Sequence, residues 1–125
     1  MQDIFILLIG LQIKHFAADY LLQNNWMIAG KRSVFALGGY AHAGVHAAGT
    51  AVVLLPMGLP LGSVAAIIIS EFFVHYGLDF AKARFDTQKR GEEDPKRFWA
   101  KHGLDQMLHQ LTYVAIAYAV VSVSA

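Results

Sequence analysis

Hydrophobic residues are gathered into four long segments, which short polar or turn-forming stretches separate. The segments cover residues 4–28, 34–55, 61–85 and 98–123. The first is followed by Gly30-Lys31-Arg32, the second by Pro56, and the third by the hydrophilic stretch DTQKRGEEDPK. Each has about 22–26 residues, and a helix of that length is longer than the ~30 Å hydrocarbon core of a bilayer. We therefore predict an all-α fold in which four helices cross a membrane, with residues 1–125 as one integral membrane domain. The alternative is a soluble all-helical bundle of the same four helices, because the first segment also carries several polar residues.

Each apolar segment also carries two side chains of metal-binding type, four residues apart. The pairs are His15/Asp19, His42/His46, His75/Asp79 and Asp105/His109. Residues at this spacing share one face of a helix. All four pairs lie at a similar depth, about 7–20 Å from the end of the segment nearest the basic stretches. We expect a four-helix transmembrane bundle with a polar layer of His and Asp in its interior.

Composition supports the membrane interpretation. The chain is 56% hydrophobic and 15% charged, whereas a soluble domain has about 25% charged residues. It contains no cysteine, which excludes a disulfide framework, a cysteine zinc site and a thiolate nucleophile.

The basic residues predict the orientation in the membrane. Nine of the ten Lys and Arg residues fall within 31–32 and 82–101. If all four segments cross, both stretches lie on one side, which the positive-inside rule makes the cytoplasm, so that both termini are external. The start MQDIF lacks the basic region of a signal peptide, and we expect the first segment to be retained as an anchor.

The aspartates give a physical reason for a metal. Asp19, Asp79 and Asp105 would share one layer with Glu71 nearby, and Lys14 is expected on the opposite side of its helix from Asp19. An Asp at the centre of a membrane helix costs about 2.5–3.5 kcal/mol, and divalent cations would offset that cost. We predict a mono- or dinuclear site.

The expected metal ligands are drawn from all four pairs, and they are His15, Asp19, His42, His46, His75, Asp79, Asp105 and His109. Mixed nitrogen and oxygen ligands suit zinc first, with manganese and iron as alternatives. Glu71 and Asp79 are the candidate catalytic residues, with Glu71 as a general base that does not bind the metal; a metal ligand, a proton relay and a residue at a helix end are the alternatives for Glu71. The alternative is a hydrogen-bonded polar core of neutral His and protonated Asp without metal.

Other polar and aromatic residues have supporting interpretations. Tyr113 is either an oxyanion donor or interfacial packing, and Lys82 could attract a phosphate to the cytoplasmic mouth. Trp26 and Trp99 lie beside the basic stretches and are interpreted as interfacial anchors. His102 is expected to be solvated rather than a ligand. Four glutamines are interpreted as hydrogen-bonding partners between helices, and these are Gln12, Gln23, Gln106 and Gln110.

Longer stretches around the pairs carry a family resemblance. HFAADYLLQNNWMIAGKR, HAGVHAAGTAVVL, HYGLDFAK and LDQMLHQLT together resemble the small bacterial membrane proteins of the domain of unknown function 3307 family. The resemblance covers nearly the whole chain and implies a location in the bacterial inner (plasma) membrane. That family is loosely similar to membrane-bound metal-dependent hydrolases, and this likeness implies hydrolysis.

Three classes of function remain open from the sequence. The first is a metal-dependent hydrolase acting on a phosphoester or lipid-linked substrate. The second is a metal-ion or proton transporter that uses the same layer as a transit site. The third is a di-iron redox protein. The expected surroundings are the lipid bilayer, no nucleic-acid partner is expected, and a second copy of the chain stays open as a partner.

Overall fold

The computed structural model describes residues 2–86 and 94–125, and all regular structure in this part of the chain is helical. The prediction of an all-α fold is therefore confirmed. In order, the elements are α1 (Gln2–Phe16), the π-helical turn η1 (Ala17–Leu22), α2 (Asn25–Gly30), α3 (Leu37–Leu54), the short 3-10 turn η2 (Leu55–Met57), α4 (Leu61–Phe85) and α5 (Pro95–Ser124).

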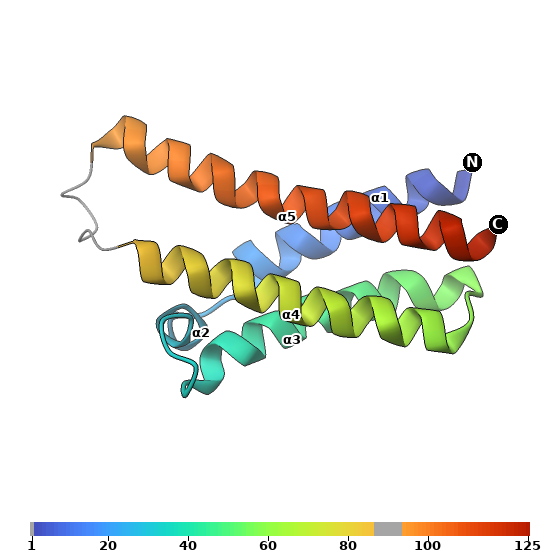
Figure 1. Cartoon of the computed structure of the whole chain (residues 1–125), viewed down its shortest axis with the longest axis horizontal. Helices are drawn as coiled ribbons and strands as arrows, with labels where there is room; N and C mark the ends of the chain where they lie inside the picture. Colours follow the sequence, from blue (N-terminus) through green and yellow to red (C-terminus); the bar gives the residue numbers. More distant parts are fainter. Residues whose placement is uncertain (1, 87–93) are drawn as a thin grey trace.

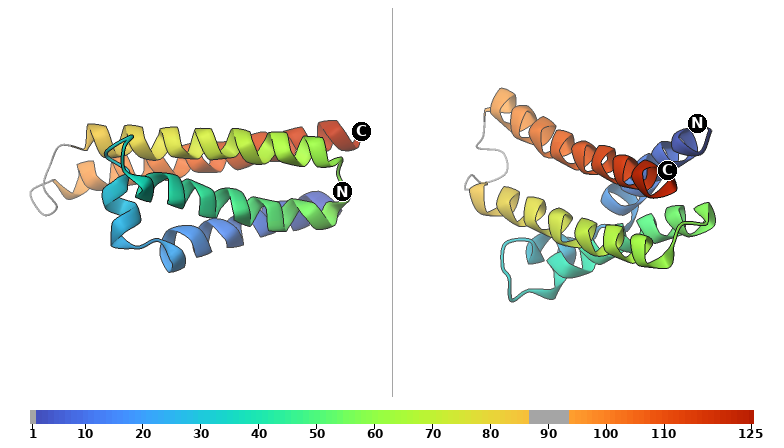
Figure 2. Two further views of the ribbon diagram at one scale, coloured as in Figure 1. Left: turned by 90° about the horizontal axis from the view of Figure 1, so that it is seen from below. Right: turned by 45° about the vertical axis from the view of Figure 1, so that its right-hand side comes forward.

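The long helices lie side by side and alternate in direction (Figure 1). α1 and α4 run toward the end of the molecule where α2 lies, whereas α3 and α5 run away from it. α3 packs against both α1 and α4, and α5 also contacts these two helices. The short helix α2 lies across this end of the molecule and packs on α3 (Figure 2). Both ends of the described chain consequently lie at the opposite end from α2.

Three stretches in the described residues are long and apolar enough to cross a membrane, namely Gln2–Leu22, Leu61–Phe85 and Pro95–Ser124. The chain is thus a membrane protein by the length and composition of its helices. The sequence predicted four crossing segments, and α3 is not among the three. α3 has 18 residues, about 27 Å of helix, and much of its polar content is buried against α1 and α4.

The first predicted helix, over 4–28, is wrong in its continuity. The α-helix ends at Phe16, η1 follows, and Gln23 and Asn24 are extended before α2 begins. Asn24 causes the restart, because its side chain accepts a hydrogen bond from the backbone N–H of Met27 at 3.0 Å and so caps α2. The break turns the chain from the direction of α1 into that of α2.

The other predicted boundaries hold to within a few residues. α4 matches the prediction over 61–85, and α3 begins at Leu37 rather than at 34. α5 begins at Pro95 rather than at 98, because proline is well tolerated in the first turn of a helix. Within the predicted loop DTQKRGEEDPK, residues 87–93 lie outside the described residues.

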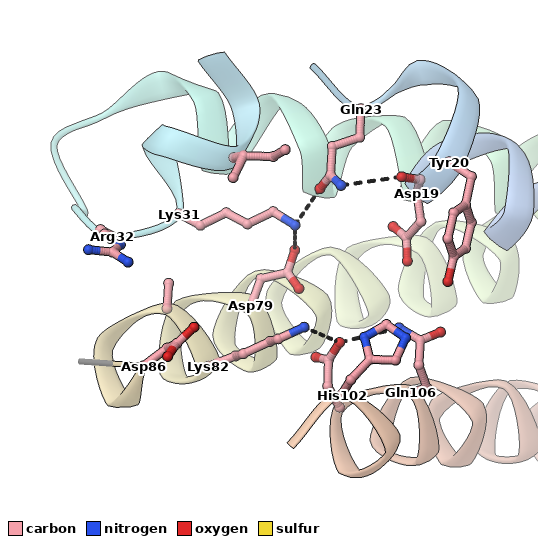
Figure 3. Close-up of a pocket in the computed structure, with 13 residues that line it drawn as sticks. Asp19, Tyr20, Gln23, Lys31, Arg32, Asp79, Lys82, Asp86, His102 and Gln106 are labelled. Carbon is pink, nitrogen blue, oxygen red and sulfur yellow. Dashed lines mark hydrogen bonds and ion pairs between the residues drawn. The ribbon is translucent and has the colours of Figure 1, made fainter. Parts of the chain in front are cut away.

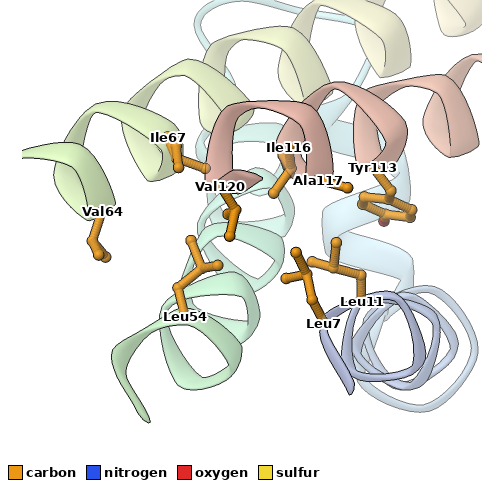
Figure 4. Packing of buried hydrophobic residues seen from close by; sticks show 9 residues of the cluster. All are labelled: Leu7, Leu11, Leu54, Val64, Ile67, Tyr113, Ile116, Ala117 and Val120. Atoms are coloured by element: carbon orange, nitrogen blue, oxygen red, sulfur yellow. The ribbon is translucent and has the colours of Figure 1, made fainter. Parts of the chain in front are cut away.

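A hydrophobic cluster fills the interior toward the chain ends (Figure 4). Side chains from all four long helices point toward one another there, and they are Leu7, Leu11, Leu54, Val64, Ile67, Tyr113, Ile116, Ala117 and Val120. All of them are at most 9% exposed. The polar layer lies between this cluster and α2, so the cluster separates that layer from the end that carries the chain termini.

Candidate metal centre

The predicted polar layer is present, and four elements contribute to it. α3 supplies His42 and His46 one turn apart, and α4 supplies His75 and Asp79 in the same way. His109 comes from α5. The four imidazoles are at most 2% exposed. Asp19 reaches the layer from η1, whose π-helical winding widens the turn at this point, a feature often found at functional sites.

The side chains of the layer form two groups that share His75. In the first group, Asp19, His42, His46 and His75 each offer a ligand atom within 4.8 Å of the others. The second group consists of His75, Asp79 and His109 under the same limit. Two ligands on opposite sides of a zinc ion are at most about 4.2 Å apart, because Zn–N and Zn–O bonds are about 2.0–2.1 Å. In a tetrahedral zinc site such ligand atoms lie about 3.3–3.4 Å from one another, so atoms of either group that are now as much as 4.8 Å apart would move inward by about 1 Å to hold an ion.

The imidazole nitrogens show whether the side chains of the layer suit a bound metal ion. Nε2 of His42, His75 and His109 is buried and has no hydrogen-bond partner among the described residues. Each of these atoms nevertheless faces carboxylate oxygens: His42 Nε2 lies 3.1 Å from Asp19 Oδ1, and His75 Nε2 lies 3.3 Å from Asp79 Oδ2. Buried polar atoms normally have partners. Imidazole nitrogens that converge on carboxylates without a well-formed hydrogen bond are the donor set that zinc and related cations bind, so the residues fit a metal.

His46 and His75 are stacked, with ring centroids 3.7 Å apart. His46 also forms a hydrogen bond from Nε2 to Asp19 Oδ1 at 2.8 Å. The ring centroids of His75 and His109 are 4.5 Å apart, which brings α4 and α5 together at the centre of the layer. The imidazoles thus form one continuous cluster across three helices.

His15 and Asp105, the remaining predicted ligands, lie beside the two groups rather than in them. His15 has partners on both nitrogens, since Nδ1 lies 2.8 Å from the Tyr113 hydroxyl and Nε2 lies 2.9 Å from Gln106 Oε1. Asp105 binds Lys82 through Oδ2 at 2.8 Å, and its Oδ1 lies 3.5 Å from His109 Nδ1. Both residues are therefore placed to orient the side chains of the groups.

Lys14 lies inside the protein, contrary to the expectation from the helical wheel. Its ammonium forms a buried ion pair with Glu71 and lies 3.2 Å from His46 Nδ1. The buried face of α1 is centred on Leu7, Leu11 and Lys14 rather than on the more exposed Gln12. Gly49 makes room for the lysine, because a Cβ at Gly49 would lie 3.2 Å from both Cβ and Cδ of Lys14.

Two further lysines neutralise aspartates of the layer. Lys31 Nζ lies 2.9 Å from Asp79 Oδ2, and Lys82 pairs with Asp105. Lys82 follows Asp79 by one helical turn in the sequence, whereas Lys31 reaches the layer because α2 packs on α3. The case for a metal consequently rests on the convergence of imidazole nitrogens and carboxylates more than on excess negative charge.

A cavity of about 280 Å³ opens between the layer and the α2 end (Figure 3). Asp19 and Asp79 form part of its wall, together with Lys31, Arg32 and Lys82. In Figure 3, Lys31 extends between Gln23 and Asp79, with hydrogen-bond distances of 2.5 Å and 2.9 Å. Asp86 and Asp105 also line the cavity, so its wall holds both cationic side chains and carboxylates, and two of these carboxylates belong to the metal groups.

Glu71 does not line this cavity but lies on the other side of the layer. Its side chain is buried with Lys14, and it borders a second, apolar opening between α4 and α5. His102 does line the cavity.

The predicted hydrogen-bonding role of the glutamines agrees with the contacts. Gln12 donates to Gln110 at 2.5 Å and so connects α1 with α5. Gln106 contacts His15, and Gln23 binds Lys31 and the backbone carbonyl of Asp19. Trp26 and Trp99 are exposed, as interfacial anchors require.

Fold and site together define an all-helical membrane protein with a buried cluster of His and Asp that could hold a metal ion. The chain belongs to the family described as "Protein of unknown function (DUF3307)", whose model matches residues 5–125. No curated protein and no solved structure matches the chain.

Proposed function

We propose that this protein is a metal-dependent hydrolase of the bacterial inner membrane, acting on a phosphoester or lipid-linked substrate at a mono- or dinuclear centre. One observation carries the proposal: Asp19 and Asp79 belong both to the metal groups and to the wall of a cavity that Lys31, Arg32 and Lys82 also line. Cationic side chains in the cavity wall can bind phosphate oxygens. The carboxylates that would hold the metal line the same cavity, beside these cationic groups.

The proposed ligands are Asp19, His42, His46, His75, Asp79 and His109, with zinc first and manganese or iron as alternatives. A bound divalent ion lowers the pKa of water and stabilises charge on phosphoryl oxygens. Asp79 has one oxygen toward His109 and the other toward His75 and Lys31. It can therefore hold a ligand position while Lys31 moves to a phosphate oxygen. His15 and Asp105 would keep Asp19 and His109 in place.

The membrane arrangement is part of the proposal. α1 and α4 run in the same direction, so the chain must return between them, and α3 is the helix that does so. We infer that α3 also crosses, which completes a four-helix transmembrane bundle. The basic α2 end then faces the cytoplasm and both termini are external.

The hydrophobic cluster favours hydrolysis over transport. Conduction requires an ion to leave the layer on both sides, whereas a set of fully packed side chains, with Leu7, Leu11 and Leu54 at 0% exposure, lies beyond the layer. The cavity on the α2 side gives access from one side, as an enzyme needs.

Hydrolysis of p-nitrophenyl phosphate by the protein in nanodiscs tests this function. We expect activity that chelation abolishes and added zinc, manganese or iron restores. Asp79→Asn should lower kcat/KM at least ~100-fold, whereas Asp94→Asn, an exposed position on α5's N-terminal side, should not. Absence of metal-dependent hydrolysis would overturn the proposal, and zinc flux into vesicles would then favour transport.

A further inference from the structure

A second opening lies between α4 and α5. It is on the side of the metal layer away from the cavity of Figure 3, which is lined by Lys31, Arg32 and Lys82 and is called the basic cavity below. It has a volume of about 250 Å³ and is lined mainly by small or apolar side chains, among them Ala66 and Ala115. Both helices are long and apolar enough to cross a membrane, and Ala66 and Ala115 are exposed on their surface. This opening, the α4–α5 groove, therefore faces the hydrocarbon of the bilayer.

Three polar side chains line the α4–α5 groove, and they are Ser70, Glu71 and Thr112. The hydroxyl of Thr112 donates to the backbone carbonyl of Leu108. Glu71 lines the groove and is 2% exposed, and its Oε2 has no hydrogen-bond partner among the described residues. The other carboxylate oxygen is bound to Lys14. A carboxylate oxygen accepts hydrogen bonds only, so a ligand that satisfies it must bring a donor into the groove.

The groove lies close to the metal layer. Glu71 is one helical turn from His75, and its partner Lys14 lies 3.2 Å from His46 Nδ1. The basic cavity and the groove are therefore on the two sides of the imidazoles, and both are bordered by α4 and α5. A molecule cleaved at the layer would have its phosphate toward the lysines and its leaving group toward Glu71.

We propose that the α4–α5 groove binds the long-chain alcohol portion of the substrate, which makes the substrate a lipid phosphate monoester. This inference rests on the proposed function. Hydrolysis breaks the bond between phosphorus and the lipid oxygen, and the oxygen of water joins phosphorus. A proton from that water ends on the lipid oxygen. The resulting hydroxyl donates to Glu71 Oε2, and the hydrocarbon chain lies in the groove and continues into the bilayer.

Photoaffinity labelling tests the groove without any need for catalysis. The probe is hexadecanol with a diazirine in its chain, added to the protein in phosphatidylcholine nanodiscs. We expect labelled peptides from residues 66–74 and 112–119. The methyl ether of the same probe, which lacks the donor, should label them about fivefold less.

Neighbouring alanines supply a matched pair of variants. Ala66 lines the groove and Ala65 does not, although both are exposed on α4. Ala66→Phe should fill the groove and reduce labelling about tenfold, whereas Ala65→Phe should leave it within about twofold. Equal labelling by alcohol and ether, or equal effects of the two variants, would overturn the inference. If the wild-type protein does not hydrolyse p-nitrophenyl phosphate, the proposed enzyme function is refuted, whatever the labelling shows.

Discussion

At the scale of single residues, the ion pair between Lys14 and Glu71 is the most consequential contact that the sequence did not reveal. It joins α1 to α4 beneath the imidazoles, and both side chains are almost fully buried. A buried pair contributes little net stability when it is intact, but loss of one partner leaves an isolated charge in a poorly solvated interior.

Removal of one partner should therefore cost much more than removal of both. We expect Lys14→Met to lower the free energy of unfolding by about 3–5 kcal/mol, with a similar loss for Glu71→Gln. The double variant should recover more than half of the summed loss. Unfolding in detergent, followed by circular dichroism, measures all three. Additive losses would show that the two side chains do not depend on each other.

The residue scale also shows how far sequence reasoning reached. The spacing of four residues placed His42, His46, His75, Asp79 and His109 together correctly, because such spacing fixes the face of any straight helix. The prediction for Lys14 was wrong, because a helical wheel does not show which face of α1 is buried when polar residues lie on more than one face. Lys31 could not have been found, because its approach to Asp79 depends on the docking of α2.

At the scale of elements, α2 determines the shape of the cavity mouth. Its contact with α3 is close enough that only glycine fits: a Cβ at Gly38 would lie 2.3 Å from the carbonyl oxygen of Trp26. Gly30 on α2 meets Gly38 and Gly39 in the same way. This contact holds Lys31 at the C-terminal end of α2, where it reaches Asp79.

Gly38→Ala should push α2 away from α3 and separate Lys31 from Asp79. We expect a loss of about 1–3 kcal/mol in unfolding free energy and a changed emission spectrum of Trp26, read in a Trp99→Phe background. Gly44→Ala is the matched control on the same helix, because nothing lies within 4 Å of its added Cβ. The control should be neutral or slightly stabilising. Similar behaviour of the two variants would contradict the close packing of α2 on α3.

The elements themselves were largely predictable, and their exceptions have local causes. α4 and α5 follow directly from long apolar runs bounded by proline and charge. The first segment was predicted as one helix because a hydropathy pattern does not show where a helix is capped. Asn24 caps α2 and so starts a new helix in the middle of an apolar stretch. The π-helical turn that carries Asp19 leaves no hydrophobic signature at all.

At the scale of the whole molecule, the directions of the long helices bear on the number of membrane crossings. Three stretches qualify by length and hydropathy, but the alternating directions of the long helices require α3 to return the chain between α1 and α4. α3 can be shorter and more polar than a lipid-exposed helix, because polar residues in a membrane helix face the protein interior.

The absence of native cysteines allows a direct test of this topology. We expect Ser33→Cys to react with a membrane-impermeant maleimide from the cytoplasmic side only. Leu61→Cys, which is exposed at the start of α4, and Ser124→Cys should react from the opposite side only. Reaction of Ser33→Cys and Leu61→Cys from the same side would show that α3 does not cross.

The metal content of the purified protein is the most direct test of the central claim, that the buried imidazoles and carboxylates hold a cation. Elemental analysis should find one or two equivalents of zinc, manganese or iron per chain. His75→Ala, which removes the residue shared by both groups, should lose most of that metal, whereas His102→Ala should keep it. A wild-type protein that binds no divalent metal, or a His75→Ala variant with full metal content, would contradict the claim.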